Sequence, residues 1–393
     1  MNRNFILGFA AFLLCLTSCG NGNTPAETVF PELTYSVTKE DLGEGKFNVT
    51  DMVGRKVEIT PGSYERVVCV GAGALRLYSY VGDLDLLCGV EDIDNPSLES
   101  RPKMFDNVPR PYLLAGKDKF VTLPSCGVGG PQAQAAEAEK ILSCRPDIVI
   151  SEYEDADKEN ALQKQLGVPV ITLRTGSAGM VNTTVYSSLA LLGFVFGEDA
   201  RAKDVIEYHY HSTKDIFDLT KKANHRKKGY ACGLGNWGTT DQFMTAQNYD
   251  VFNFTHIDNV VTGLPKDGIQ KIEEEKFTSL AKDMEVMIFD AAAVKNIKGK
   301  NFDFSICKAF QTGEVYLQMA YNAYYTNVET ALINAWFVAS VAYPDLFPAF
   351  DIAKKADEIT LKFNRKALYS EMKALPQAYG GYQKIANPTE FFK

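Results

Sequence analysis

The chain has 393 residues, of which 46% are hydrophobic and 23% charged, and its formal net charge is -8. This composition is typical of a globular protein with enough apolar residues for two domains with cores of their own, and it excludes an intrinsically disordered chain. The negative net charge gives no electrostatic reason to expect a nucleic acid or an anionic membrane surface as a partner, because both select basic patches. We therefore expect no nucleic-acid partner.

The N-terminus has the layout of a lipoprotein signal peptide. A basic Arg3 precedes the apolar run Phe5–Leu16, which is too short to span a bilayer and ends just before Cys19. We expect residues 1–18 to be removed and Cys19 to be lipidated, with palmitate among its acyl chains. The alternative, a buried or transmembrane helix, lacks a stop-transfer flank. Residues 19–46 then form a lipid-anchored tether, and the protein works outside the cytoplasm, at the periplasmic face of a membrane or at the cell surface.

Six cysteines remain in the mature chain, and none of their spacings matches a CxxC metal or redox motif. Cys69 and Cys88 lie in apolar runs, so we expect them to be buried free thiols. The disulfide state of the set stays open at this point. The six are Cys69, Cys88, Cys126, Cys144, Cys232 and Cys307.

Residues 47–181 alternate between strand and helix patterns and form a first, N-terminal lobe. A hairpin at Asp51–Ile59 turns at Gly54, and the strand Val67–Val70 leads through a glycine turn into the helix Ala74–Val81. The alternation that follows is typical of βαβ units and predicts a largely parallel sheet. Its predicted strands are 86–90, 147–151 and 168–173, and its predicted helices are 132–142 and 158–166.

Residues 182–225 predict a linking helix, because apolar residues recur at helical spacing and no proline interrupts them. A break near Gly197 is the one interruption that the pattern suggests. Residues 226–393 then form a second, C-terminal lobe of the same type. Its predicted strands are 229–234, 286–289 and 315–317, and its predicted helix, 330–343, ends at Pro344. The fold class is thus α/β, with two α/β lobes that have mainly parallel sheets and are joined by a single long α-helix.

Four stretches in a fixed order carry a resemblance to a known family. They are the hairpin with Asp51, Gly54 and Arg55; the strand and turn from Val67 to Leu77; the helix, Pro-Asp and strand segment with Glu139, Ile141, Pro146, Asp147 and Val149; and the run from Tyr321 to Ala331. From about Phe47 to the C-terminus, the chain resembles the substrate-binding lipoproteins of ABC importers for ferric siderophores, haem and cobalamin. These are the helical-backbone class of periplasmic binding proteins.

The resemblance implies a monomeric binding protein that captures a small-molecule metal chelate, an iron complex such as a ferric siderophore or haem, and delivers it to an ABC permease and its ATPase. A corrinoid is the alternative ligand within the same class. No cofactor beyond the ligand is implied. In the family, one glutamate on each lobe docks into the permease. Glu139 matches the first position, and Glu275 is taken for the second among the run Glu273–Glu275, where two of the three must be solvated charges.

The ligand site is expected between the lobes, where open α/β sheets bind ligands at the carboxyl ends of their strands. Gly71 and Gly73 allow a tight turn that aims backbone amides at the cleft, and Arg76 follows in the first turn of the helix, where it is either a clamp for a ligand anion or a surface ion-pair partner. Gly127 lies in a second small-residue loop, Ser125–Pro131, which is either a ligand contact or a plain connection.

Aromatic residues supply the second half of the expected site. Trp237 lies among turn residues after a strand, which favours stacking on a ligand over core packing, and Gln242 is a polar neighbour. Tyr321, Tyr324 and Tyr325 come just before a predicted helix; chelate contact, packing and direct iron ligation are all open to them. We assign no metal site and no catalytic residue. A hydrolase or a structural lipoprotein is the competing class, but no HExxH, nucleophile elbow or Walker loop occurs.

Overall fold

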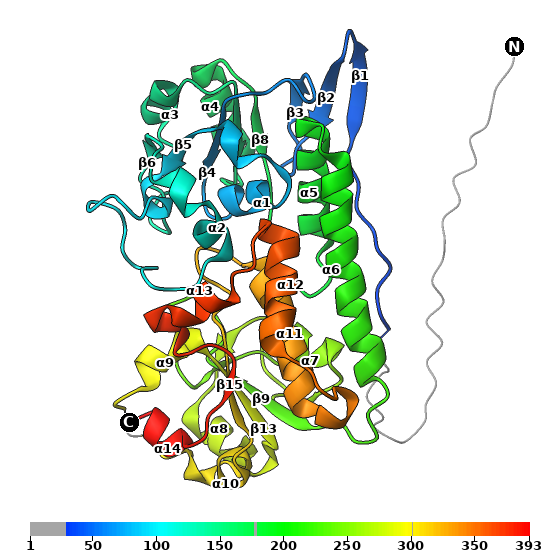
Figure 1. Cartoon of the computed structure of the whole chain (residues 1–393), viewed down its shortest axis with the longest axis vertical. Coiled ribbons are helices and arrows are strands. Elements are labelled where there is room, and N and C mark those ends of the chain that lie inside the picture. The colour runs from blue at the N-terminus through cyan, green and yellow to red at the C-terminus, as the bar shows by residue number, and fades with distance from the viewer. Residues whose placement is uncertain (1–28, 177–178, 301) are drawn as a thin grey trace, which may run out of the picture.

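The structure is a computed structural model that describes residues 29–176, 179–300 and 302–393. The expected signal peptide, Cys19 and the first part of the tether lie outside the described residues. Two α/β lobes follow each other along the long axis of the molecule, the first at the top of Figure 1 and the second at the bottom. Within the described residues, no helix is long and apolar enough to cross a membrane.

A small antiparallel sheet precedes the first lobe. Its strands are β1 (Lys39–Gly43), β2 (Lys46–Thr50) and β3 (Lys56–Ile59), and β2 and β3 form the predicted hairpin around Gly54. The turn of the hairpin contains a buried ion pair between Arg55 and Asp51, 3.1 Å long. Arg55 also donates to Asn160 and Gln163 of the helix 156–166 and to the carbonyl oxygen of Val170, so this one guanidinium fixes the hairpin to two elements of the first lobe.

The first lobe is built on a five-stranded parallel sheet in the order β6-β5-β4-β7-β8. The strand at Val67–Val70 and the helix at Ala74–Val81 have the predicted bounds. Helix α3 begins later than predicted, at Ala138, and α2 was not predicted at all. The strands are β4 (Val67–Val70), β5 (Leu87–Glu91), β6 (Ser125–Gly127), β7 (Ile148–Ser151) and β8 (Val170–Thr172); the helices are α1 (Ala74–Val81), α2 (Pro111–Phe120), α3 (Ala138–Cys144) and α4 (Ala156–Leu166).

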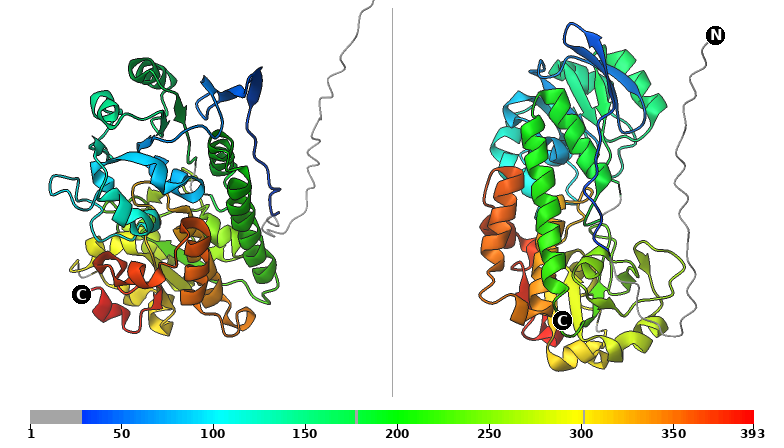
Figure 2. Two further views of the ribbon diagram at one scale, coloured as in Figure 1. Left: turned by 45° about the horizontal axis from the view of Figure 1, so that its top comes forward. Right: turned by 90° about the vertical axis from the view of Figure 1, so that its right-hand side faces the viewer.

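The linking region consists of two helices, α5 (Thr183–Phe196) and α6 (Asp199–Thr220). The break falls at Gly197, which has a φ of 70° and caps α5 in the left-handed conformation that glycine adopts most readily. Helix α5 packs on α1 of the first lobe, whereas α6 contacts α1 as well as α7, α11 and α12 of the second lobe. The long helix α6 therefore runs beside both lobes (Figure 2).

The second lobe contains a five-stranded sheet in the order β11-β9-β13-β14-β15, in which only β15 is antiparallel to its neighbour. A separate two-stranded sheet pairs β10 with β12. The strands are β9 (Lys228–Cys232), β10 (Met244–Thr245), β11 (Asp258–Asn259), β12 (Gln270–Lys271), β13 (Val286–Asp290), β14 (Val315–Gln318) and β15 (Gln383–Lys384). The helices are α7 (Asp250–Phe254), α8 (Glu274–Leu280), α9 (Ala291–Ile297), α10 (Lys308–Thr312), α11 (Val328–Ala342), α12 (Ile352–Asn364), α13 (Tyr369–Ala374) and α14 (Pro388–Phe391).

The cysteines of the described residues are buried free thiols. This confirms the expectation for Cys69 and Cys88, which lie on β4 and β5. Burial raises the pKa of the Cys88 thiol to about 11, because the thiolate would lose its hydration there. Cys69 and Cys88 are therefore packing groups of the first lobe, because burial disfavours their reactive thiolate form.

Candidate functional site

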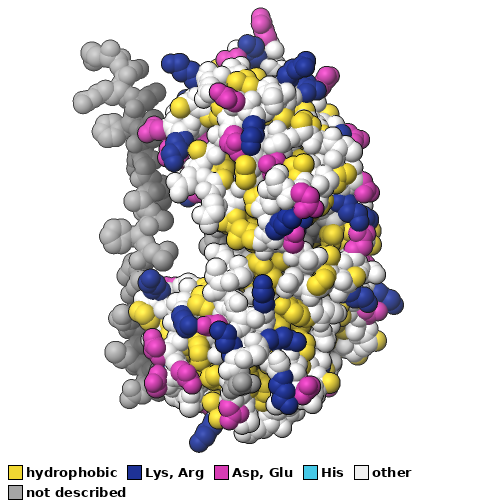
Figure 3. All heavy atoms as spheres, turned by 90° about the vertical axis from the view of Figure 1, so that its left-hand side faces the viewer, with side chains coloured by type: hydrophobic (Ala, Val, Ile, Leu, Met, Phe, Trp, Pro, Cys, Tyr) yellow, Lys and Arg dark blue, Asp and Glu magenta, His cyan; other side chains and the backbone are white. Residues whose placement is uncertain are grey.

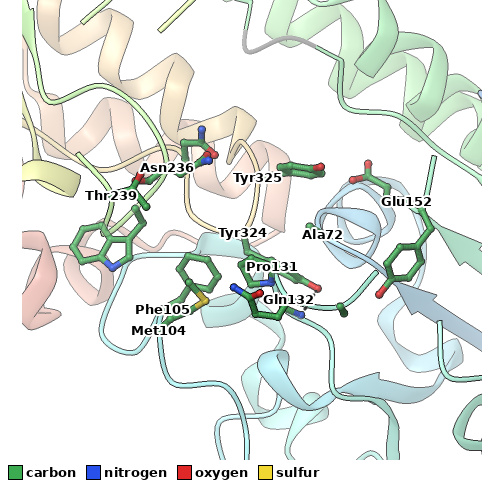
Figure 4. A pocket seen from close by; sticks show the side chains of 15 residues that line it. Ala72, Met104, Phe105, Pro131, Gln132, Glu152, Asn236, Thr239, Tyr324 and Tyr325 are labelled. Atoms are coloured by element: carbon green, nitrogen blue, oxygen red, sulfur yellow. Dashed lines mark hydrogen bonds between the residues drawn. The ribbon is translucent and has the colours of Figure 1, made fainter. Parts of the chain in front are cut away.

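A cavity of about 350 Å³ lies between the two lobes. The space-filling view shows the molecule hollowed between them at its left edge (Figure 3), and Figure 4 shows the lining side chains. The volume is at the lower end of the range of roughly 300–1,000 Å³ found for small-molecule sites. The cavity is lined by Ala72, Met104, Phe105, Gly130, Pro131, Gln132, Ala133, Glu152, Tyr153, Asn236, Trp237, Thr239, Asn322, Tyr324 and Tyr325.

The lining residues come from loops at the carboxyl ends of parallel strands in both sheets. Ala72 follows β4 and Glu152 follows β7 in the first lobe, while Trp237 follows β9 and Tyr324 follows β14 in the second. Parallel strands carry their carboxyl ends to one edge of a sheet, where open α/β folds bind ligands. The carboxyl-end edges of the two sheets, which are the edges suited to binding, therefore face each other across the cavity.

The chemistry of the cavity wall is aromatic and amide-rich. Rings of tyrosine, phenylalanine and tryptophan provide flat apolar faces, and the side-chain amides of Gln132, Asn236 and Asn322 provide donors and acceptors. Among the described lining residues there is no lysine, arginine or histidine, and Glu152 is the one carboxylate. Such a wall suits a ring-containing ligand without a large excess of negative charge.

Tyr324 crosses from the second lobe into the first at the floor of the cavity. Its hydroxyl donates to Oε2 of Glu91, 2.9 Å away, and accepts from the backbone N–H of Gly130 at 3.0 Å. Its ring lies 5.9 Å from that of Phe105. Burial raises the pKa of Glu91 to about 7, although hydrogen bonds from the Gly71 N–H and Tyr324 partly offset the effect. Tyr324 thus joins the lobes while it forms part of the ligand surface.

Arg76 does not line the cavity, so it is not a clamp for a ligand anion. Nor is it a surface ion-pair partner, which was the other role expected for it. Its side chain is fully buried and reaches the loop 323–327 of the second lobe. Nε donates to Oδ1 of Asn327 at 3.1 Å, and the terminal nitrogens donate to the carbonyl oxygens of Ala323, Tyr324 and Thr326. The planar guanidinium suits this set of convergent acceptors. Arg76 therefore holds a cavity-forming loop in place and has no surface ion pair.

The loop that Arg76 holds has an unusual backbone. Tyr324 and Tyr325 have φ values of 55° and 63°, a conformation that costs energy for residues with a Cβ and persists only where the surroundings enforce it. The side chain of Asn327 supplies further enforcement, since Nδ2 donates to the carbonyl oxygens of Tyr321 and Ala323. The result is that the ring of Tyr324 points into the floor while Tyr325, 49% exposed, stands in the cleft.

Of the nine predicted ligand residues, Trp237, Tyr324 and Tyr325 line the cavity. Tyr321 and Gln242 are buried behind the wall; Tyr321 accepts from the Asn327 N–H, and Gln242 accepts from the Tyr230 hydroxyl through its backbone carbonyl. Gly127 lies on β6, next to Glu137. Gly71, Gly73 and Arg76 shape the cavity from behind without lining it.

Glu152 is the lining residue of most chemical interest that the sequence analysis did not identify. It directly follows the predicted strand 147–151, and the rule that ligands bind at the carboxyl ends of parallel strands would have pointed to it. Phe105 carries no comparable signal, because it lies in an irregular segment whose path the sequence pattern does not define; Gln132 directly follows the loop Ser125–Pro131, but it was predicted only as the start of a helix.

The two glutamates expected at the permease interface are both exposed. Glu139 lies in α3 of the first lobe and Glu275 in α8 of the second. Among the described residues, no group of three or more His, Cys, Asp and Glu side chains is arranged to hold a metal ion.

Two lobes with facing sheet edges, an aromatic cavity between them and a helix beside both define a two-lobed solute-binding protein. A family model described as periplasmic binding protein matches residues 67–307, and the chain belongs to this family. Members of the family are extracytoplasmic solute-binding proteins, which deliver small ligands to ABC permeases. Among curated proteins, none matches this sequence significantly.

Solved structures with this fold share little sequence with the chain. The periplasmic solute binding protein of Veillonella parvula has 18% identity and a TM-score of 0.64, over 88% of this chain and 99% of that one. The molybdate-binding MolA of Haemophilus influenzae has 17% identity and a TM-score of 0.59, over 81% and 98%. The TroA-like protein FepB of Veillonella parvula has 17% identity and a TM-score of 0.58, over 81% and 97%. Such identities establish a common fold only.

Proposed function

We propose that this protein is a lipid-anchored binding component of an ABC importer, which captures an iron complex, a ferric siderophore or haem-like chelate, in the cavity between its lobes. The observation that carries the proposal is the wall of the cavity. Trp237, Tyr324, Tyr325 and Phe105 offer flat or edge-on aromatic contacts to the organic shell of a chelate.

The absence of basic side chains from the described lining residues argues against a small oxyanion as the cargo. A molybdate-like dianion is held most strongly by charge-assisted hydrogen bonds from cationic donors, whereas the described lining residues offer only neutral amides and hydroxyls and one carboxyl group. The similarity to MolA therefore does not extend to a proposal of molybdate binding.

A corrinoid is the second candidate ligand, and one observation favours it. Gln132 of the first lobe and Asn236 and Asn322 of the second bring three side-chain amides to the cavity. Amides both donate and accept hydrogen bonds, so they complement the amide groups around the rim of a corrin ring.

The proposal assigns ligand contact to Trp237, Tyr324 and Tyr325, lipidation to Cys19 and permease docking to Glu139 and Glu275. The lipid anchor is tested in cells that receive a labelled fatty acid. Wild type is expected to carry the label and Cys19→Ser to lose it; a labelled Cys19→Ser variant would contradict the assignment.

The ligand is tested by a thermal-shift screen of the soluble body, from Thr24 onward, against ferric siderophores, haem, corrinoids, free metals and oxyanions. A ligand at about 100 times its Kd stabilises the folded state by roughly 2.7 kcal/mol, which is an easily measured shift. A shift with an iron complex supports the proposal. A shift with oxyanions alone, or with no iron complex, would refute it.

A further inference from the structure

Glu152 lies on the side of the cavity that the first lobe forms. It follows β7 directly, and its backbone N–H donates to the carbonyl oxygen of Val70 on β4 at 3.0 Å. Its side chain lines the cavity, and Figure 4 shows the carboxylate on the same side of the pocket as Tyr325. The carboxylate is therefore part of the surface that a ligand would meet.

The glycine turn after β4 leaves the room that this carboxylate needs. Gly71 and Gly73 have φ values of +89° and +105°, which residues with a side chain rarely adopt. A Cβ on Gly73 would lie 2.6 Å from Oε2 of Glu152, and a Cβ on Gly71 would lie 3.3 Å from the Glu152 backbone. The turn that was expected to approach a ligand instead accommodates Glu152.

Within the part of the chain that the structure describes, Glu152 lacks hydrogen bonds at both of its carboxylate oxygens, whereas Asp92 and Glu159, which are also buried, each lack them at one oxygen. Glu152 is buried, with 6% of the residue exposed, yet neither carboxylate oxygen has a hydrogen-bond partner among the described residues. In the same part of the molecule, Glu91 accepts from the Gly71 N–H and the Tyr324 hydroxyl, and Glu329 accepts from Tyr80 and Asn364. A buried carboxyl without partners is costly unless something else supplies them.

The described charged groups around Glu152 donate no hydrogen bond to its carboxyl, so a ligand is left to supply the donor. Arg76 and Glu154 act on its charge in opposite directions, and Tyr325 faces it from the second lobe. The donors of Arg76 are directed to the loop 323–327. Burial is the dominant effect and holds the pKa of Glu152 well above its usual range, because a carboxylate without hydrogen-bond donors is poorly stabilised there.

We propose that Glu152 selects cationic chelates, because its carboxylate accepts a charge-assisted hydrogen bond from a protonated amine on the bound molecule. This inference rests on the proposed function and narrows its ligand class. The amine brings the missing donor, and the carboxyl releases its proton to solvent as the ion pair forms. An anionic chelate offers Glu152 no such donor, and no basic side chain among the described lining residues would attract it.

Two iron complexes that differ in one charge test the proposal. Ferrioxamine B carries a pendant amine that is protonated at neutral pH, and its N-acetyl derivative is neutral with the same iron centre. Calorimetry with wild type is expected to show a Kd at least tenfold lower for the amine than for the acetylated form, as a charge-assisted hydrogen bond requires. Titrations in two buffers of different ionisation enthalpy are expected to show release of a proton with the amine only.

Two variants with the same change of charge distinguish the effect of the Glu152 carboxylate from that of a nearby carboxylate outside the cavity. Glu152→Gln keeps the shape and is expected to bind the two complexes within about twofold of each other, without proton release. Glu154→Gln is the control, because Glu154 is exposed and pairs with Arg174 at 2.6 Å outside the cavity; it is expected to keep the tenfold preference. Circular dichroism before and after titration establishes that each variant is folded.

The outcomes distinguish this inference from the proposed function. Equal binding of the two complexes by wild type, or a preference that survives in Glu152→Gln, overturns the inference and leaves the function standing. Binding of only neutral or anionic iron complexes from the wider panel does the same. If no iron complex binds, the proposed function fails and the inference fails with it.

Discussion

Arg76 and Asn327 belong to different lobes, yet Nε of Arg76 donates to Oδ1 of Asn327 over 3.1 Å in a fully buried contact. A second buried link lies beside it, in which the Tyr80 hydroxyl of α1 donates to Glu329 of α11. These contacts and the floor contact of Tyr324 connect the lobes on the side of the cleft that faces the protein interior. The lobes are thereby joined by buried polar groups as well as by α6.

Arg76→Ala is expected to lower the free energy of unfolding by about 3–5 kcal/mol, since three buried acceptors and the part-buried Thr326 carbonyl would lose their donor. Arg76→Lys is expected to recover only part of this loss, because an ammonium group cannot reproduce the planar fork. Urea denaturation measures both. Arg174→Ala is the control: its exposed ion pair with Glu154 is expected to contribute no more than about 1 kcal/mol. Equal losses in Arg76→Ala and Arg174→Ala would contradict the role of Arg76.

Trp237 is expected to report ligand binding by its fluorescence, because it lines the cavity and an iron complex quenches nearby emission. The chain has two tryptophans, and the other, Trp336, lies on α11, where its indole N–H donates to Ser212. The variant Trp336→Phe therefore leaves Trp237 as the single emitter and is expected to keep the quenching. Trp237→Phe is expected to lose it and to bind more weakly. Full quenching in Trp237→Phe would place the ligand elsewhere.

X-ray scattering is expected to give nearly the same radius of gyration with and without ligand. Helix α6 contacts both lobes, and the links made by Arg76, Tyr80 and Tyr324 would have to break for a wide opening. Movement on binding should therefore be small, as a continuous helix beside both lobes favours. A large compaction on addition of the ligand would show that these links open in solution.

The stability of the protein is expected to fall between about pH 5 and pH 8 in part because of Glu159 on α4. Burial raises the pKa of its carboxyl to about 7. A carboxyl whose pKa is higher in the folded than in the unfolded state contributes stability that is complete below about 4.5 and is lost as the pH rises through about 7. The difference corresponds to about 3 kcal/mol.

Glu159→Gln is expected to be more stable than wild type at pH 8 and to show a weaker dependence on pH. Burial also raises the pKa values of Glu91 and Asp290 to about 7, so part of the dependence should remain. Urea midpoints at pH 5, 6.5 and 8 measure the effect, with exposed Glu154→Gln as the control. A variant that follows the pH profile of wild type would show that Glu159 is ionised in the folded protein throughout this range.

Charge reversal at the two expected docking positions is predicted to separate binding from transport. Glu139→Lys and Glu275→Lys change exposed side chains on α3 and α8, away from the cavity lining. Ligand affinity should stay as in wild type, while uptake by cells should be lost. Glu274→Lys makes the same change of charge one residue away and should leave uptake intact. Normal uptake in Glu139→Lys would rule out the docking role of Glu139.

The sequence predicted those parts of the fold that depend on local pattern. The strand Val67–Val70, its glycine turn and α1 follow from a short apolar run and two glycines, and the break at Gly197 follows from glycine at a helix end. Helix α2 was missed, because only a proline at its start and two lysines near its end mark it. The delayed start of α3 shows that a run of alanines and glutamines does not by itself fix where a helix begins.

The site could be predicted only where a residue type is out of place in its surroundings. Trp237 and the tyrosine pair stood out as aromatic residues in turns, and they line the cavity. Arg76 and Glu152 could not be understood in this way, because their roles depend on the loop 323–327 and on the cleft, which lie far away in the sequence. Whether a guanidinium has partners or a carboxylate lacks them is a property of the folded chain.

The two-residue strand β15 affects whether two copies of this chain can associate through the edge of a sheet. Gln383 and Lys384 lie antiparallel to Leu317 and Tyr316 of β14, and the Ile385 N–H donates to the Val315 carbonyl at 2.8 Å. These residues cover what would otherwise be the open edge of the second sheet, where exposed backbone groups invite a strand from another molecule. A chain shortened before Gln383 would leave this edge uncovered, so we expect it to self-associate more readily than the full chain.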